Sequence, residues 1–153
     1  MLRVTLATVH LLALGMGLGA VWARATVLTG SLDLPTMRRA FRADTWWGVA
    51  ALLWLATGLW RLFAGTEKAT GYYLQNHIFF AKMGMFVLVL LLEIWPMITL
   101  IRWRQIASRG TSAWNPNPVA ARRIARISRI EALLVAAMVL AAAAMARGYG
   151  SPR

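Results

Sequence analysis

The sequence predicts an all-α integral membrane protein, a bundle of four helices that cross the bilayer. Four long apolar stretches, at residues 4–23, 45–64, 78–101 and 130–146, hold only Arg61 and Lys82 of the 17 Lys and Arg residues of the chain. The last stretch is predicted to continue a helix that begins near residue 119, so the predicted segments are 4–23, 45–64, 78–101 and 119–146. Each segment is long enough to cross a hydrocarbon core of about 30 Å as a helix. The composition agrees, because 59% of the residues are hydrophobic and only 14% are charged, whereas about a quarter are charged in soluble domains. We therefore expect a single transmembrane domain over residues 1–153.

The strongly basic composition does not indicate a nucleic-acid-binding protein. The formal net charge is +12, but the basic residues flank the apolar segments and form no separate basic domain. No nucleic acid is therefore expected as a partner. The absence of cysteine from the sequence excludes disulfides, thiolate metal sites and thiol catalysis.

The distribution of Lys and Arg between the connections predicts the orientation in the membrane. The larger group falls in the first and third connections: Arg24, Arg38, Arg39, Arg42, Arg102, Arg104, Arg109, Arg122, Arg123, Arg126 and Arg129. The smaller group falls on the opposite side: Arg3, Lys68, Arg147 and Arg153. Basic residues in short connections resist translocation. We therefore expect a multi-pass membrane protein with both termini on the non-cytoplasmic side.

The start of the fourth segment, residues 119–129, is expected to lie at the cytoplasmic headgroups. The preceding cluster at 114–118, with two prolines, cannot continue a helix, so a new helix begins after it. Its first turns place Arg122, Arg126 and Arg129 along one side. These side chains predict contact with anionic lipid headgroups.

Three basic side chains are predicted to lie at a similar depth near the outer ends of their helices. At about 1.5 Å per residue, His10 lies roughly 9 Å, Lys82 roughly 6 Å and Arg61 roughly 5 Å inside. With His77 they would form a basic layer that has only Glu67 nearby to balance it. Such a layer favours an anionic ligand, such as a propionate, a phosphate or a quinone oxygen. Alternatively, the long side chains reach outward to the interface and the histidine bonds a neighbouring carbonyl.

Glu93 lies deep within its predicted helix, roughly 22 Å from one end and roughly 12 Å from the other. An ionised group at this depth needs a partner. The candidates are Arg24 and Arg102, or Glu93 is protonated. Asp44 is a further polar residue of the same region, and Pro96 is expected to kink the helix.

Five short motifs are spread over most of the chain. They are RRAFRAD at 38–44, LWLATGLWRLF at 53–63, FFAK at 79–82, EIWPM at 93–97 and IRWR at 101–104. These motifs resemble a bacterial family of predicted four-helix membrane proteins with no assigned function, DUF2214. The resemblance implies a fold and a location in the bacterial inner (cytoplasmic) membrane, and no particular reaction.

A second resemblance concerns the first and third apolar segments. His10 is followed by a glycine-rich run that contains tryptophan, and the third segment opens near Lys82. This arrangement is similar to the HemJ-type membrane protoporphyrinogen oxidases and the CopD-like membrane proteins. The resemblance implies haem b, with His10 as an axial iron ligand and Lys82 as the partner of a propionate or a substrate carboxylate. Arg61 joins them as a cofactor-binding candidate. The candidates for a second axial ligand are His77, Met16, Met83 and Met85.

Three functions remain open on the sequence, and a non-catalytic one is favoured. The first is an accessory or assembly subunit, or a homo-oligomer, that packs through the Gly15-x-x-x-Gly19 face of the first helix or through the tryptophan-rich second helix. The second is a haem b-binding or tetrapyrrole-related redox protein, which as an enzyme would be a haem-dependent membrane oxidoreductase. The third is a small transporter in which Glu93 couples transport to protons.

Overall fold

The computed structural model describes residues 1–63, 76–110 and 114–150 of the chain. The described residues form four helices and no strand: α1 (Leu2–Val27), α2 (Leu34–Phe63), α4 (His77–Ser108) and α5 (Pro118–Ala146). The predicted all-α bundle is therefore confirmed. The first three helices extend beyond their predicted apolar segments, because their polar end turns continue the same helical backbone.

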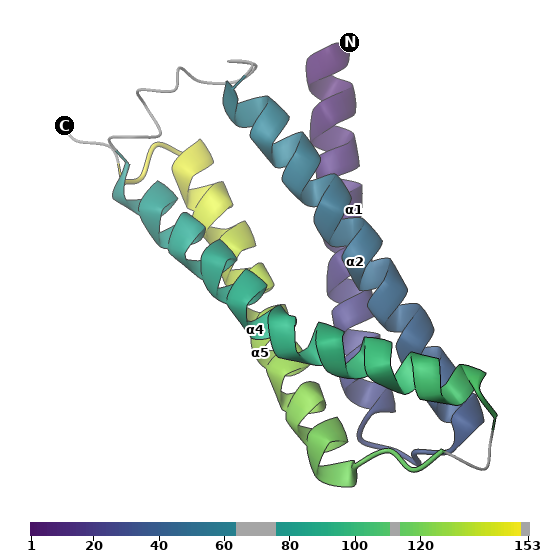
Figure 1. Cartoon of the computed structure of the whole chain (residues 1–153). Coiled ribbons are helices and arrows are strands. Elements are labelled where there is room, and N and C mark those ends of the chain that lie inside the picture. The colour runs from purple at the N-terminus through teal and green to yellow at the C-terminus, as the bar shows by residue number, and fades with distance from the viewer. Residues whose placement is uncertain (64–75, 111–113, 151–153) are drawn as a thin grey trace.

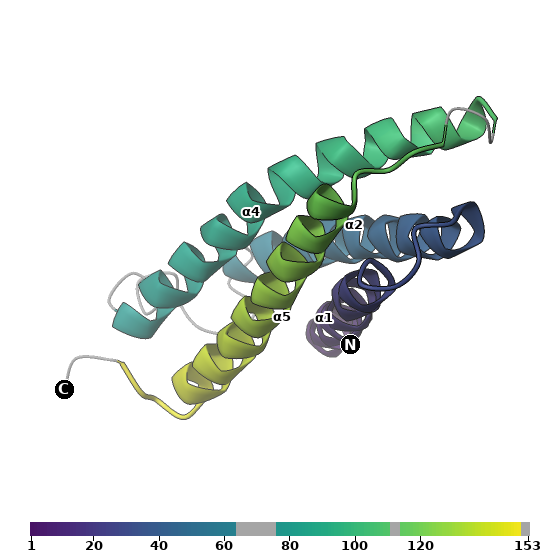
Figure 2. The same cartoon turned by 90° about the horizontal axis from the view of Figure 1, so that it is seen from below.

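The helices pair as two antiparallel hairpins (Figure 1). α1 packs along α2 and α4 packs along α5, while α1 also contacts α5 and α2 contacts α4 more sparsely. The two hairpins meet at the end of the molecule away from the N-terminus and diverge toward it (Figure 1). Figure 2 views the same arrangement from the end where they meet. The bundle is therefore wider at the end that carries the N-terminus than at the opposite end.

Polar side chains cap the helices where the connections enter them. The Asn76 side chain accepts hydrogen bonds from the first backbone N–H groups of α4, and Asn117 does the same for α5, where Pro118 follows it. Asp33 accepts a 2.8 Å hydrogen bond from the backbone N–H of Thr36 at the start of α2. These contacts satisfy N–H groups that the first helical turn leaves without partners.

The cap at the start of α2 gives a pH-dependent prediction. The side-chain hydrogen bond from Thr36, followed by the bond from its backbone N–H, lowers the pKa of Asp33 below its usual value. A carboxyl whose pKa is lower in the folded state stabilises the fold fully above its unfolded pKa, and this contribution disappears as the pH falls through the folded pKa. Asp33→Asn keeps a hydrogen-bond acceptor but cannot titrate. The melting temperature of the variant should therefore fall less than that of the wild-type protein as the pH drops below about 4. Circular dichroism melts at several acidic pH values would measure this, and identical pH profiles for the two proteins would contradict it.

The core is arranged in layers along the bundle. The layer near the joined ends of the hairpins consists of Leu28, Met37, Ala40, Phe41, Leu100, Trp103, Ala121, Ile124 and Ala125. A second layer consists of Ala20, Val21, Trp47, Val89, Ala132, Val135 and Met138. α4 changes direction near its middle (Figure 1), as expected for a helix that contains an internal proline, here Pro96.

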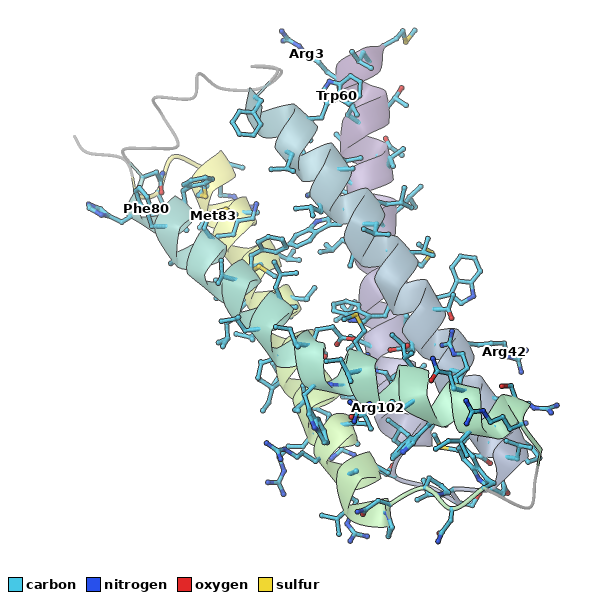
Figure 3. The ribbon with its side chains drawn as sticks, viewed as in Figure 1. Arg3, Arg42, Trp60, Phe80, Met83 and Arg102 are labelled. Carbon is cyan, nitrogen blue, oxygen red and sulfur yellow. The ribbon has the colours of Figure 1, made fainter. Side chains whose placement is uncertain are left out.

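Three of the described helices, α1, α4 and α5, are long and apolar enough to cross a membrane. α2 is not among these three. It contains four tryptophans and Arg61, which make it less apolar, and its predicted crossing stays a prediction. Arg3 lies at the diverging end of the bundle and Arg42 and Arg102 lie toward the joined end (Figure 3). The assignment of the joined end to the cytoplasm also stays a prediction.

One of the residues used for the orientation lies elsewhere than expected. The sequence pattern places Arg24 in the first connection, but α1 continues to Val27 and Arg24 is fully buried within it. The reason is that its guanidinium finds acidic partners on the other three helices. Arg24 is therefore a bundle residue, while the charge asymmetry persists without it.

Candidate functional site

A cavity of about 550 Å³ lies between the two hairpins, in the half of the bundle near the termini. All four helices contribute to its wall, which is mostly apolar and aromatic. Its polar or ionisable lining side chains are His10, Arg61 and Lys82. The rest of the lining consists of Leu11, Leu14, Trp54, Leu55, Gly58, Leu59, Phe79, Met83, Phe86, Met138, Val139, Ala142, Met145 and Ala146. A cavity of about 300–1,000 Å³ with apolar walls and a few convergent polar groups is typical of small-molecule and cofactor sites.

His10 is held in a defined orientation by α2. Its Nδ1 lies 2.8 Å from the hydroxyl oxygen of Thr57, and its ring stacks on Trp54 at 5.4 Å between centroids. Thr57 donates its single hydroxyl proton to the carbonyl of Leu53 at 2.7 Å, so its oxygen accepts from His10. Nδ1 therefore carries the ring proton, and in the neutral ring Nε2 carries the lone pair.

A glycine makes room for this imidazole. A Cβ atom at Gly58 would lie 3.3 Å from Cε1 of His10, which is closer than comfortable van der Waals contact. The sequence around Thr57 and Gly58 thus provides both the hydrogen bond and the space that orient His10.

None of the three polar cavity residues is without a partner in the protein. Glu67, which was expected to balance them, lies outside the described residues. His77 begins α4 and is exposed, so it is not part of the cavity wall. Of the methionines predicted as second axial ligands, Met83 lines the cavity, whereas Met16 and Met85 are absent from its wall.

A second polar site, a buried ion cluster, lies between the two core layers. Its centre is the guanidinium of Arg24 on α1, and every other helix supplies at least one partner. Nε donates to Ser128 at 2.9 Å and Nη1 donates to Asp44 at 2.8 Å. Glu93 receives two parallel hydrogen bonds of 2.7 Å, one from each Nη nitrogen. Nη2 also donates to Glu131 at 2.8 Å.

These contacts use all five N–H groups of the guanidinium, because Nε has one and each Nη has two. Asp44 has a second, weaker cationic neighbour, since Arg104 approaches its other oxygen at 3.5 Å and is itself 45% exposed. Such a paired arrangement meets the requirement that a charge buried in a membrane has partners.

A small cavity of about 60 Å³ separates the ion cluster from the larger cavity. Glu93 lines it on one side, and it shares Leu14, Trp54 and Phe86 with the wall of the larger cavity. The indole Nε1 of Trp54 is buried without a hydrogen-bond partner among the described residues. Leu14, Trp54 and Phe86 thus separate the larger cavity from the small cavity that Glu93 lines.

The model of a family described as predicted membrane proteins, DUF2214, matches residues 2–150. The chain belongs to the DUF2214 family. No curated protein and no solved structure matches the chain. The likeness of this DUF2214 member to the HemJ-type and CopD-like proteins stays a prediction.

The structure brings the predicted site residues together in two groups. His10, Arg61 and Lys82 meet at the larger cavity, and their roles stay predictions. Arg24, Asp44 and Glu93 meet in the ion cluster, which confirms Arg24 as the partner of Glu93. Arg102, the other candidate partner, is exposed on α4.

Two side chains of the candidate sites in this DUF2214 protein, Glu131 and Thr57, were not predicted from the sequence. Glu131 is the acidic residue of an otherwise apolar segment, and that pattern was a usable signal. Thr57 gave no comparable signal, because a threonine in a helix usually bonds its own backbone. Only the packing of α1 against α2 shows that Thr57 orients His10.

Proposed function

We propose that this protein binds a lipophilic, anionic small molecule in the cavity between its hairpins, and that haem b or a related tetrapyrrole is the ligand to test first. The observation that carries the proposal is the convergence of His10, Arg61 and Lys82 on one apolar cavity. Apolar and aromatic walls favour a lipophilic ligand body, and basic side chains favour carboxylates on it. Because the three already have partners, a carboxylate would join or replace those contacts.

The donors present fit a haem group. A ligating histidine usually donates its other ring N–H to a neighbouring acceptor, which fixes the tautomer, and His10 does this through Thr57. Nε2 would be the iron ligand, Lys82 and Arg61 would hold propionates, and Met83 offers a thioether in the same wall. A bound haem would supply a redox centre. The chain itself would hold it, orient it and exclude water.

The test compares haem b with metal-free protoporphyrin, which has the same carboxylates but no iron. We expect both to bind the purified protein, followed by the Soret band and by quenching of tryptophan fluorescence. His10→Ala should remove the ligation-dependent shift of the haem spectrum and affect protoporphyrin much less. Lys82→Ala should lower the affinity for both ligands about 10-fold, because one charge-assisted hydrogen bond is lost.

The matched control is His77→Ala, which removes the other histidine of the chain from an exposed position outside the cavity wall. It should leave both affinities unchanged. Failure of both porphyrins to bind would overturn the proposal. Equal effects of the His10 and His77 variants would overturn the role of His10.

The other two functions stay predictions. Gly15 and Gly19 are exposed, and a Cβ atom at either would meet nothing within 4 Å in the described structure, so their face is available for a subunit or a second copy of the chain. Glu93 lines the small cavity next to the ligand site, which is compatible with proton-coupled transport. The membrane location itself is supported by the family and by the three apolar helices.

A further inference from the structure

The charges of the ion cluster do not balance. Three carboxyl groups, from Asp44, Glu93 and Glu131, surround the single guanidinium of Arg24. Even with the half-exposed Arg104 counted as a second cation, full ionisation would leave one negative charge in excess. An uncompensated charge in the interior of a membrane protein is strongly unfavourable, so such a group takes up a proton instead.

The three carboxyl groups are not equivalent. Glu93 is held by two parallel hydrogen bonds from Arg24, the geometry that best stabilises a carboxylate. Asp44 has a different arginine at each of its oxygens. Both groups also retain some exposure, 18% and 11% of their side chains respectively. These two are the carboxylates that the surroundings stabilise as anions.

Glu131 is different. Its side chain is 0% exposed, and only Oε2 is hydrogen-bonded, to Arg24. Oε1 is buried without a hydrogen-bond partner among the described residues. Arg24 cannot supply one, because all five of its N–H groups are already used. A protonated carboxyl needs fewer donors than a carboxylate, and its O–H can itself donate to an oxygen of the cluster.

We propose that the ion cluster is a proton-binding site and that Glu131 carries the proton as a neutral carboxylic acid at neutral pH. Proton uptake converts the carboxylate of Glu131 and one proton from water into a carboxyl group, with no other bond made or broken. The cluster then contains two carboxylates, which Arg24 and Arg104 balance. The charged groups that act on Glu131 are Arg24 from α1, which donates to it, and Glu93 from α4. Asp44 from α2 and Ser128 from α5 are the remaining partners of Arg24.

Infrared spectroscopy tests this directly, because only a protonated carboxyl has a high-frequency C=O stretch. We expect the purified protein, in a detergent without ester or carboxyl groups, to show this band at neutral pH and to show its shift in D₂O. Glu131→Gln should lose the band. Asp33→Asn, at an exposed acid outside the cluster, should keep it.

The thermal stability gives a second readout. Glutamine has the shape and the neutrality of the protonated acid, so Glu131→Gln should melt close to the wild-type temperature at neutral pH. If this variant failed to fold, the band in the wild-type protein should still disappear in one step as the pH is raised. Absence of the band from the wild-type protein at neutral pH, or its persistence in Glu131→Gln with loss in Glu93→Gln, would overturn the proposal.

Discussion

Replacing Arg24 with glutamine should strongly destabilise the protein. The guanidinium contacts all three carboxyls of the ion cluster and Ser128, and its loss leaves those groups without their main donor. Removing one partner of a buried ionic network costs about 3–5 kcal/mol. We expect Arg24→Gln to unfold at a markedly lower temperature in detergent and to accumulate poorly in the membrane.

The matched control is Arg102→Gln, which removes an arginine from an exposed position on α4. Its effect should stay within about 0.5 kcal/mol. Arg24→Lys should rescue only part of the loss, because an ammonium group cannot reproduce the planar, two-pronged contact with Glu93. Equal stability of the Arg24 and Arg102 variants would show that the cluster does not hold the helices together.

The second large effect is expected at the crossing of α1 and α2. A Cβ atom at Gly17 would lie 3.2 Å from Cβ of Ala50 and 3.3 Å from the Trp47 ring. Both neighbours are buried, at 1% and 7% exposure, and they line the small cavity of about 60 Å³ together with Gly17. This small cavity is the space that an added side chain would find there. Gly17→Leu should force the hairpin apart and cost about 1–3 kcal/mol, measured by thermal or denaturant unfolding in detergent.

Gly15 and Gly19 provide the controls on the same helix. Both are exposed with nothing within 4 Å of an added Cβ atom, so Gly15→Leu and Gly19→Leu should leave the unfolding temperature of the monomer nearly unchanged. A similar loss of stability in all three variants would contradict the assigned crossing. If the two control variants reduced only self-association or co-purification with a partner, they would support the subunit role.

Hydropathy was sufficient to predict that the chain forms four helices and roughly where they lie, but it did not predict the polar end turns that extend three of them, such as residues 34–44 of α2. The sequence also predicted a similar depth for His10, Arg61 and Lys82, because the rise per residue along a helix gives the distance of each side chain from the helix end. Depth does not give rotation about the helix axis. Their convergence on one cavity depends on how the two hairpins are turned toward each other.

The glycines of α1 also show that the sequence does not give the rotation of a helix about its axis. The Gly15-x-x-x-Gly19 spacing predicted a packing face, yet within the described chain the close contact is made by Gly17, on the opposite side of the helix. Small residues permit close approach, but they do not say which of two faces meets the neighbour.

The ion cluster was predictable only in part. Glu93 clearly required a cation, and Arg24 was one of two candidates. The hydropathy pattern placed Arg24 in the first connection and so gave no sign that it is buried. Its acidic partners lie on three other helices, and their proximity to Arg24 cannot be read from positions along the chain. Glu131 was a lone acid in an apolar segment, and its importance emerges only when the five donors of Arg24 are assigned.

The divergence of the two hairpins has a consequence for how the cavity is reached. The cavity lies between α1–α2 and α4–α5 in the half where these pairs separate (Figure 1). If both hairpins cross the bilayer as predicted, the flanks of the cavity would adjoin lipid tails. A hydrophobic compound dissolved in the bilayer could therefore enter sideways and reach His10 without first passing through water. Entry by this lateral route would depend on partitioning into the membrane, so uptake should follow the concentration of the compound in lipid more closely than its aqueous concentration.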